Sequence, residues 1–143
     1  MKKNQTKPHY EITAIIELAS DGGFNISYER PEGLEFVLAA AGQSVAEAKA
    51  EFFEMLEEYK QEYKQEGKEL PNLEFTFRYD VASFLNFYSK TFSLAGIARL
   101  TGINQRQLSN YLNGHRHASP ATTQKISKAI NNLGEELMQM EFA

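Results

Sequence analysis

The stretch from residue 93 to residue 119 constrains the fold of this chain most strongly. Apolar residues recur there at helical spacing on both sides of a glycine: Leu94, Ile97 and Ala98 before it, and Leu108, Tyr111 and Leu112 after it. That glycine, Gly102, can adopt the positive φ angle of a tight turn, and the small Ala98 lets two helices cross closely. Asn113-Gly114 then ends the second helix. The pattern predicts two short helices joined by a tight turn.

The exposed start of the second helix carries polar side chains of a particular kind. Asn104 stands at the N-cap position, so the helix begins with Gln105, Arg106 and Gln107, and Asn110 follows on the same face. Gln pairs with adenine edges and Arg with guanine edges in the major groove of DNA. A helical hairpin in an enzyme or a bundle has no need of that combination. We therefore expect these four side chains to contact bases in double-stranded operator DNA.

Charge is distributed unevenly along the chain. Residues 90–128 contain six Lys or Arg and no Asp or Glu. Residues 1–79 carry nine Lys or Arg against fifteen Asp or Glu, a balance of −6, and the whole chain is at −4. A net positive charge confined to the segment with the paired helices favours a surface that contacts nucleic-acid phosphates. The alternative is a helical dimerisation or packing module with a basic surface.

Several side chains beside the paired helices are candidates for phosphate contacts, which set the register of a protein on DNA and supply most of the salt-sensitive affinity. These candidates are Lys90, Ser93, Arg99, Ser109, His115 and Arg116. One pair of helices contacts few bases. We therefore expect two copies on a palindrome whose half-sites lie about one helical turn (~34 Å) apart. A homodimer and a tetramer are both open.

The composition excludes several classes of protein. The chain has no cysteine, which excludes a disulfide framework, a thiol nucleophile and a Cys-type zinc site. His115 and His117 have no cysteines or nearby carboxylates to complete a zinc site. We expect no metal and no cofactor. No apolar run follows the basic N-terminus, and no stretch approaches the ~20 apolar residues of a membrane span, so we expect a cytoplasmic protein that does not associate with membranes.

The first 79 residues predict an α+β domain behind a polar tail of eight residues. Strands are predicted at residues 9–18, 24–28, 34–41 and 73–79. The DGG sequence at 21–23 indicates a hairpin turn between the first two. The alanines of the third strand also permit a helix, and Gly42 interrupts it. The expected arrangement is β-β-β-α-β, a small antiparallel sheet covered on one face by one helix.

A capping box marks the start of that helix. The Ser44 hydroxyl is placed to accept a hydrogen bond from the backbone N–H of Glu47. The Glu47 carboxylate is placed to accept one from the backbone N–H of Ser44. An apolar stripe at helical period follows: Val45, Ala48, Phe52, Leu56, Tyr59 and Tyr63. The opposite face carries Glu and Lys, which we interpret as a solvated face. The helix is predicted to run to about Glu66, where Gly67 stops it.

From residue 80 onwards the pattern is helical. A first helix is predicted over 81–89, and a last helix runs from Pro120 at its first position through Leu133. Gly134 is a candidate end, and the remaining residues fit either more helix or a short strand used in dimerisation. We expect two domains: residues 1–79 as an α+β domain and residues 80–143 as an all-α DNA-binding domain.

The segment from Asp80 to Leu133 resembles the lambda-repressor-like (Xre-type) helix-turn-helix family. The family pattern A-x-x-x-G-[IV], [IL]-S and N/E-x-G falls on Ala98, Gly102, Ile103, Leu108-Ser109 and Asn113-Gly114. The resemblance implies a DNA-binding function. Family members often carry a phosphate-contacting Gln near the start of the first motif helix. Leu94 stands there in this chain, and Ser93 is the expected substitute.

The first 79 residues resemble the HicB-type antitoxins. The features that carry the resemblance are the segments YEITAIIEL, DGGFNISY and GQSVAEAKAEFFEML and the connection with Pro31 and Gly33. The resemblance implies a βββαβ partial ribonuclease-H-like fold that binds and blocks a HicA-type ribonuclease toxin, while the C-terminal domain represses the operon. An acidic domain would attract a basic ribonuclease.

Two alternatives remain open for the function. One is a transcriptional regulator whose N-terminal domain senses a small ligand or holds a dimer together, without a toxin partner. The other is an orphan structural or nucleoid-associated protein, which would bind DNA with little sequence preference.

A ribonuclease-H-like outline raises the question of nuclease activity, because true members hold metal with clustered carboxylates. The candidates are Glu17, Asp21 and Glu47. Glu17 lies near the end of a strand, Asp21 has a role in the hairpin turn, and Glu47 has one in the capping box. His9 begins a strand. We expect that the protein is not an enzyme.

Overall fold

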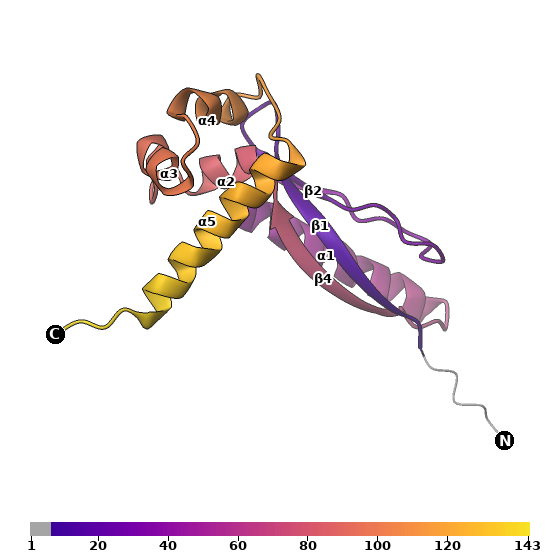
Figure 1. Ribbon diagram of the computed structural model, residues 1–143. Coiled ribbons are helices and arrows are strands. Elements are labelled where there is room, and N and C mark those ends of the chain that lie inside the picture. The colour runs from indigo at the N-terminus through magenta and orange to yellow at the C-terminus, as the bar shows by residue number, and fades with distance from the viewer. Residues whose placement is uncertain (1–6) are drawn as a thin grey trace. The chain divides into compact units, whose positions relative to one another are not determined.

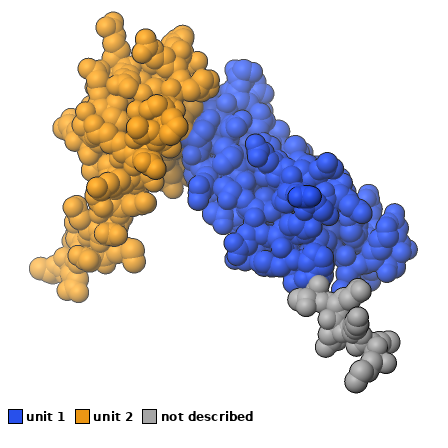
Figure 2. Space-filling view, turned by 45° about the vertical axis from the view of Figure 1, so that its right-hand side comes forward, with its two compact units in different colours: residues 1–80 blue, residues 81–143 orange. Residues whose placement is uncertain are grey.

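The computed structural model describes residues 7–143, so most of the predicted polar tail lies outside the described residues. The chain divides into two compact units, residues 1–80 and residues 81–143 (Figure 2). The first unit contains strands and one helix, and the second contains helices (Figure 1). The chain is therefore α+β. No helix among the described residues is long and apolar enough to cross a membrane.

The first unit is a four-stranded sheet with one helix on its face (Figure 1). Its elements are β1 (His9–Leu18), β2 (Phe24–Ser27), β3 (Ala40–Gly42), α1 (Val45–Gln65) and β4 (Asn72–Tyr79). The spatial order of the strands is β3-β2-β1-β4. The predicted strands at 9–18, 24–28 and 73–79 and the helix after Ser44 are confirmed within one or two residues.

The prediction of a wholly antiparallel sheet is wrong. β1 pairs antiparallel with β2, but β4 pairs parallel with β1 along its full length, from His9 opposite Asn72 to Ile16 opposite Tyr79. The helix α1 connects β3 at one edge of the sheet to β4 at the other. A crossover through a helix returns the chain to the starting end of β1, so β4 runs in the same direction. The sheet is mixed.

The predicted third strand is mostly not part of the sheet. Only Ala40–Gly42 pairs with β2, and Gly42, expected to interrupt the strand, lies opposite Phe24 within the ladder. Leu34, Phe36 and Leu38 are nevertheless buried in strict alternation. The alternating pattern therefore comes from the burial of one apolar face and not from strand pairing. Pairing ends early because β2 has only four residues.

A tyrosine supplies one of the hydrogen bonds that this irregular segment lacks from the sheet. The backbone N–H of Leu38 donates to the hydroxyl of Tyr28 at 3.1 Å. Burial raises the pKa of Tyr28 above its ordinary value, so the hydroxyl stays neutral. The Tyr63 hydroxyl of α1 donates to the Glu35 carboxylate at 3.2 Å. Side chains thus hold the segment where a ladder would otherwise do so.

Of the two hydrogen bonds predicted for the capping box of α1, one is confirmed and the other has a different donor. The Ser44 hydroxyl accepts from the Glu47 N–H at 3.1 Å. The Glu47 carboxylate, however, accepts from the N–H of Gln43 at 2.9 Å. The helix that follows this cap buries its apolar stripe against the sheet; the buried residues are Val45, Ala48, Phe52 and Leu56.

The second unit consists of four helices. They are α2 (Val81–Phe87), α3 (Leu94–Thr101), α4 (Gln105–Leu112) and α5 (Pro120–Gln139). Their common core is made of Leu85, Ile97, Ile103, Leu108, Tyr111 and Ile126. The last helix begins as predicted, with Pro120 at its first turn and the Ser119 hydroxyl accepting from the Thr122 N–H at 3.2 Å. It does not end near Gly134 but runs on to Gln139.

Alanine substitution at two glycines of this unit is expected to change the stability of the protein in opposite directions. Gly134 lies inside α5, and a Cβ added there meets nothing within 4 Å. Gly134→Ala should stabilise the protein by up to about 1 kcal/mol, because alanine has the higher helix propensity. Gly102 has a φ angle of 73°. Gly102→Ala should therefore cost about 1–2 kcal/mol. Urea unfolding of both variants measures these changes, and shifts of the same sign would contradict the assignment of the turn.

Candidate nucleic-acid interface

The turn between α3 and α4 is held by side-chain and backbone bonds. Gly102 is the C-cap of α3, with its N–H donating to the carbonyl of Ala98 at 2.8 Å. The buried Thr101 hydroxyl donates to the carbonyl of Ile97 at 2.7 Å and accepts from the N–H of Ile103 at 3.2 Å. Thr101 was not singled out from the sequence. Its position four residues after Ile97, on the same face of the helix, is the signal that could have found it.

The second motif helix presents the face that the sequence predicts. The Asn104 side chain accepts from the N–H of Arg106 at 2.8 Å, which confirms its place as N-cap. Leu108 and Tyr111 are buried beneath the helix. Gln105, Arg106 and Gln107 are exposed, and Asn110 is half-buried. The first turn of α4 therefore offers amide and guanidinium groups to solvent, while its other face is held by the core.

One of these side chains has an intramolecular partner. The Gln107 amide Nε2 donates to the Tyr111 hydroxyl at 2.5 Å, one turn along α4. This bond restricts the rotamer of Gln107 and leaves its amide oxygen as the group able to accept a further bond. Tyr111 is thus a positioning residue for Gln107 as well as a core residue. The sequence identified only its core role.

The candidate phosphate contacts are distributed around the two motif helices. Lys90, Ser93, Arg99, His115 and Arg116 are exposed, whereas Ser109 is half-buried. Two of the hydroxyls already have partners: the Ser93 oxygen accepts from the Gly96 N–H at 3.0 Å, and the Ser109 oxygen accepts from the Asn113 side chain at 3.3 Å. The cations are the more available groups.

The loop after α4 is folded back onto the helix. The carbonyl of Asn110 accepts from the N–H groups of His115 and Arg116, at 2.9 and 3.2 Å. The positive φ of Gly114, 75°, permits this reversal. His115 and Arg116 therefore lie past the C-terminal end of α4, whereas Arg106 lies in its first turn.

The carboxylates considered for nuclease chemistry have local structural partners in two of three cases. The Asp21 carboxylate accepts from the Gly23 N–H at 2.9 Å in the hairpin, and Glu47 caps α1. Glu17 is exposed on β1. Within residues 7–143, the one group of three metal-ligand side chains that lie together is His9, Glu11 and Glu74, all exposed.

That trio lies where the parallel pairing of β1 and β4 aligns the three residues. The His9 imidazole lies 3.6 Å from the carboxylate of Glu74 and 3.9 Å from that of Glu11. These distances describe weak surface ion pairs when the imidazole is protonated.

Comparison with protein families identifies the class of the second unit. A helix-turn-helix family model matches residues 89–137, about a third of the chain. That segment contains α3, α4 and most of α5. Comparison with curated proteins gave no match. The C-terminal unit is a helix-turn-helix domain, and the match supports a DNA-binding transcriptional regulator.

Proposed function

We propose that the protein is a transcriptional repressor that binds operator DNA with α4 in the major groove. The observation that carries the proposal is the exposed first turn of α4, where Gln105 and Arg106 extend from a helix anchored by Leu108 and Tyr111. Gln105, Arg106, Gln107 and Asn110 contact bases, and the nearby cations contact phosphates. All three acidic residues of the second unit lie in residues 135–141, away from the motif in sequence.

The proposal is tested by titrating the protein against a labelled DNA fragment from upstream of its own gene. A scrambled fragment of equal length is the control, and both are measured at two salt concentrations. A preference for the native fragment that survives the higher salt supports an operator-binding repressor. Equal binding to both fragments that the higher salt abolishes would contradict it, because phosphate contacts alone carry no sequence information.

The second unit also carries apolar side chains suited to self-association. Beyond Leu133, four large apolar side chains are 53–91% exposed: Leu137, Met138, Met140 and Phe142. A hollow of about 330 Å³ lies between α3 and α5, and its lining includes Leu100, Leu133, Lys125, Lys128 and Glu136. The two lysines outnumber the single acidic residue of this lining, and Glu141 at the apolar end complements them. A homodimer in which each copy places this end in the other's hollow buries both surfaces.

The dimer is tested by sedimentation equilibrium. Leu137→Glu is expected to weaken self-association at least about tenfold, since a charge would replace a buried apolar contact. Gln139→Glu adds the same charge at an exposed position of the same helix end and serves as the control. Equal dissociation constants for the two variants would place the dimer contact elsewhere, and a monomeric parent protein would exclude the dimer.

For the N-terminal unit we favour an antitoxin role, in which this HicB-like domain binds a HicA-type ribonuclease toxin. Two observations support it: the β-β-β-α-β order on one sheet and the excess of acidic residues over residues 1–79. A ribonuclease that holds anionic RNA is typically basic, so the charges are complementary. The partial ribonuclease-H-like fold is part of the same proposal.

Co-expression tests the toxin partner. The product of a small, basic open reading frame beside the gene should co-purify with the full chain and lose its ribonuclease activity in the complex. If the product of the adjacent frame does not bind this protein and does not cleave RNA, the result would favour the alternative, a regulator whose N-terminal unit senses a small ligand.

A further inference from the structure

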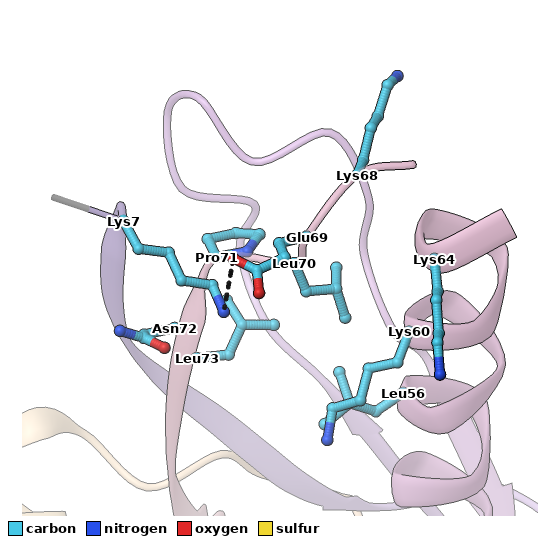
Figure 3. A pocket seen from close by; sticks show the side chains of 10 residues that line it. All are labelled: Lys7, Leu56, Lys60, Lys64, Lys68, Glu69, Leu70, Pro71, Asn72 and Leu73. Carbon is cyan, nitrogen blue, oxygen red and sulfur yellow. Dashed lines mark ion pairs between the residues drawn. The ribbon is translucent and has the colours of Figure 1, made fainter. Parts of the chain in front are cut away.

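The N-terminal unit contains a hollow of about 530 Å³ between the end of α1 and the start of β4 (Figure 3). Its apolar part is formed by Leu56 and Leu70, each 8% exposed, together with Leu73. Lys60 and Lys64 extend from α1 on one side, and Lys7 reaches in from the strand side. Small-molecule sites in proteins commonly have volumes of roughly 300–1,000 Å³ and combine an apolar lining with a few polar groups that fix the ligand.

The charge around this hollow is opposite to that of the unit as a whole. Residues 7–79 contain seven Lys or Arg, and four of them, including Lys68, line the hollow. Glu69 is the only acidic residue in the lining. A concentration of cations at one place in a domain that is otherwise acidic predicts a local attraction for anions.

The ion pairs made by the lysines of this hollow are weak and exposed. Lys60 lies 2.9 Å from Glu57, whose side chain is 64% exposed and lies outside the lining. Lys7 lies 3.9 Å from Glu69, which is 85% exposed. Lys64 makes no ion pair with any residue in the described part of the chain. Exposed ion pairs contribute little to stability, so an anion can replace these carboxylates at little cost.

We propose that this hollow binds a small organic carboxylate with an apolar chain. The leucines of the lining contact the apolar chain of the ligand, while Lys60, Lys64 and Lys7 surround its carboxylate. A nucleic-acid backbone would use the cations but not the apolar lining. A basic ribonuclease would be repelled here, so this site is distinct from a toxin-binding surface. The inference does not depend on DNA binding, and it gives the ligand-sensing alternative a defined site and ligand class.

The proposal is tested by isothermal titration calorimetry of the full chain with octanoate. We expect saturable binding at one site per chain. Butyrate tests the apolar lining, octanamide tests the need for charge, and inorganic phosphate tests anion binding without an apolar part. All three should bind at least about fivefold more weakly than octanoate. Equal affinity for any one of them, or no saturable octanoate binding, would overturn the proposal.

Variants locate the site. The double substitution Lys60→Gln/Lys64→Gln is expected to weaken octanoate binding by about 5- to 30-fold, as the loss of two exposed charge interactions predicts. Lys49→Gln removes a cation from the same helix outside the hollow, where Lys49 lies over the Phe77 ring, and should leave the affinity unchanged. Both lysines of the double variant are exposed, so folding is preserved. Equal affinity of the double variant and the parent would place octanoate elsewhere.

Discussion

Replacing Phe52 by alanine is expected to lower the free energy of unfolding of the N-terminal unit by about 3–5 kcal/mol. Phe52 is fully buried on α1. Its ring packs edge-on against two rings of β4, with centroid distances of 5.0 Å to Phe75 and 5.5 Å to Phe77, and lies 6.2 Å from Tyr28 of the segment after β2. The substitution removes the contact between helix and sheet and leaves a cavity that rigid strands cannot fill.

The neighbouring residue is a matched control for this prediction. Phe53 is on the same helix and of the same size, but it is 45% exposed. Phe53→Ala should therefore cost much less than Phe52→Ala. Urea unfolding followed by circular dichroism compares the two. Similar losses would mean that α1 does not cover the sheet in the way described.

Replacing Arg106 by alanine is expected to weaken operator binding by about 1–3 kcal/mol and to relax specificity at one base pair. Arg106 is exposed in the first turn of α4, and its backbone N–H is bound to the cap residue Asn104, so the side chain extends from a defined start of the helix. Fluorescence anisotropy against operators altered one base pair at a time measures both effects. Equal weakening on every sequence would show that Arg106 contacts only phosphate.

Arg116 supplies the comparison for this experiment. It is exposed past the other end of α4 and is expected to contact phosphate. Arg116→Ala should weaken binding almost uniformly across sequences and reduce the slope of log affinity against log salt by about 1. If Arg116→Ala altered specificity while Arg106→Ala did not, α4 would lie in the groove in another orientation.

Much of the secondary structure could be predicted from the sequence because its signals are local. Ser44 and Asn104 cap helices at the predicted positions, since a cap bonds to a backbone group only two or three residues away. Gly102 adopts the expected positive φ for the same reason. The exposure of Gln105 and Arg106 follows from helical period, because the core takes the opposite face.

Where the prediction was wrong or incomplete, the residue pattern did not contain what decided the outcome. The apolar alternation at 34–38 predicted a strand, but strand pairing needs a partner, and β2 is too short to provide one. Gly134 predicted a helix end, yet the propensity cost of one glycine, about 1 kcal/mol, did not stop α5. The bond from Gln107 to Tyr111 depends on rotamers, which residue type and spacing do not specify.

The caps, the helical faces and the helix-turn-helix motif follow from the residue pattern, because each depends on residues within one or two turns of one another. The parallel pairing of β4 with β1 follows only from the folded chain, because it joins residues more than 60 positions apart. The same long-range packing brings Lys7 beside Lys60 and Lys64 around Leu56 and Leu70. Nine of the ten lining residues lie within positions 56–73, and only Lys7 joins them from a distant part of the sequence, because β1 pairs with β4.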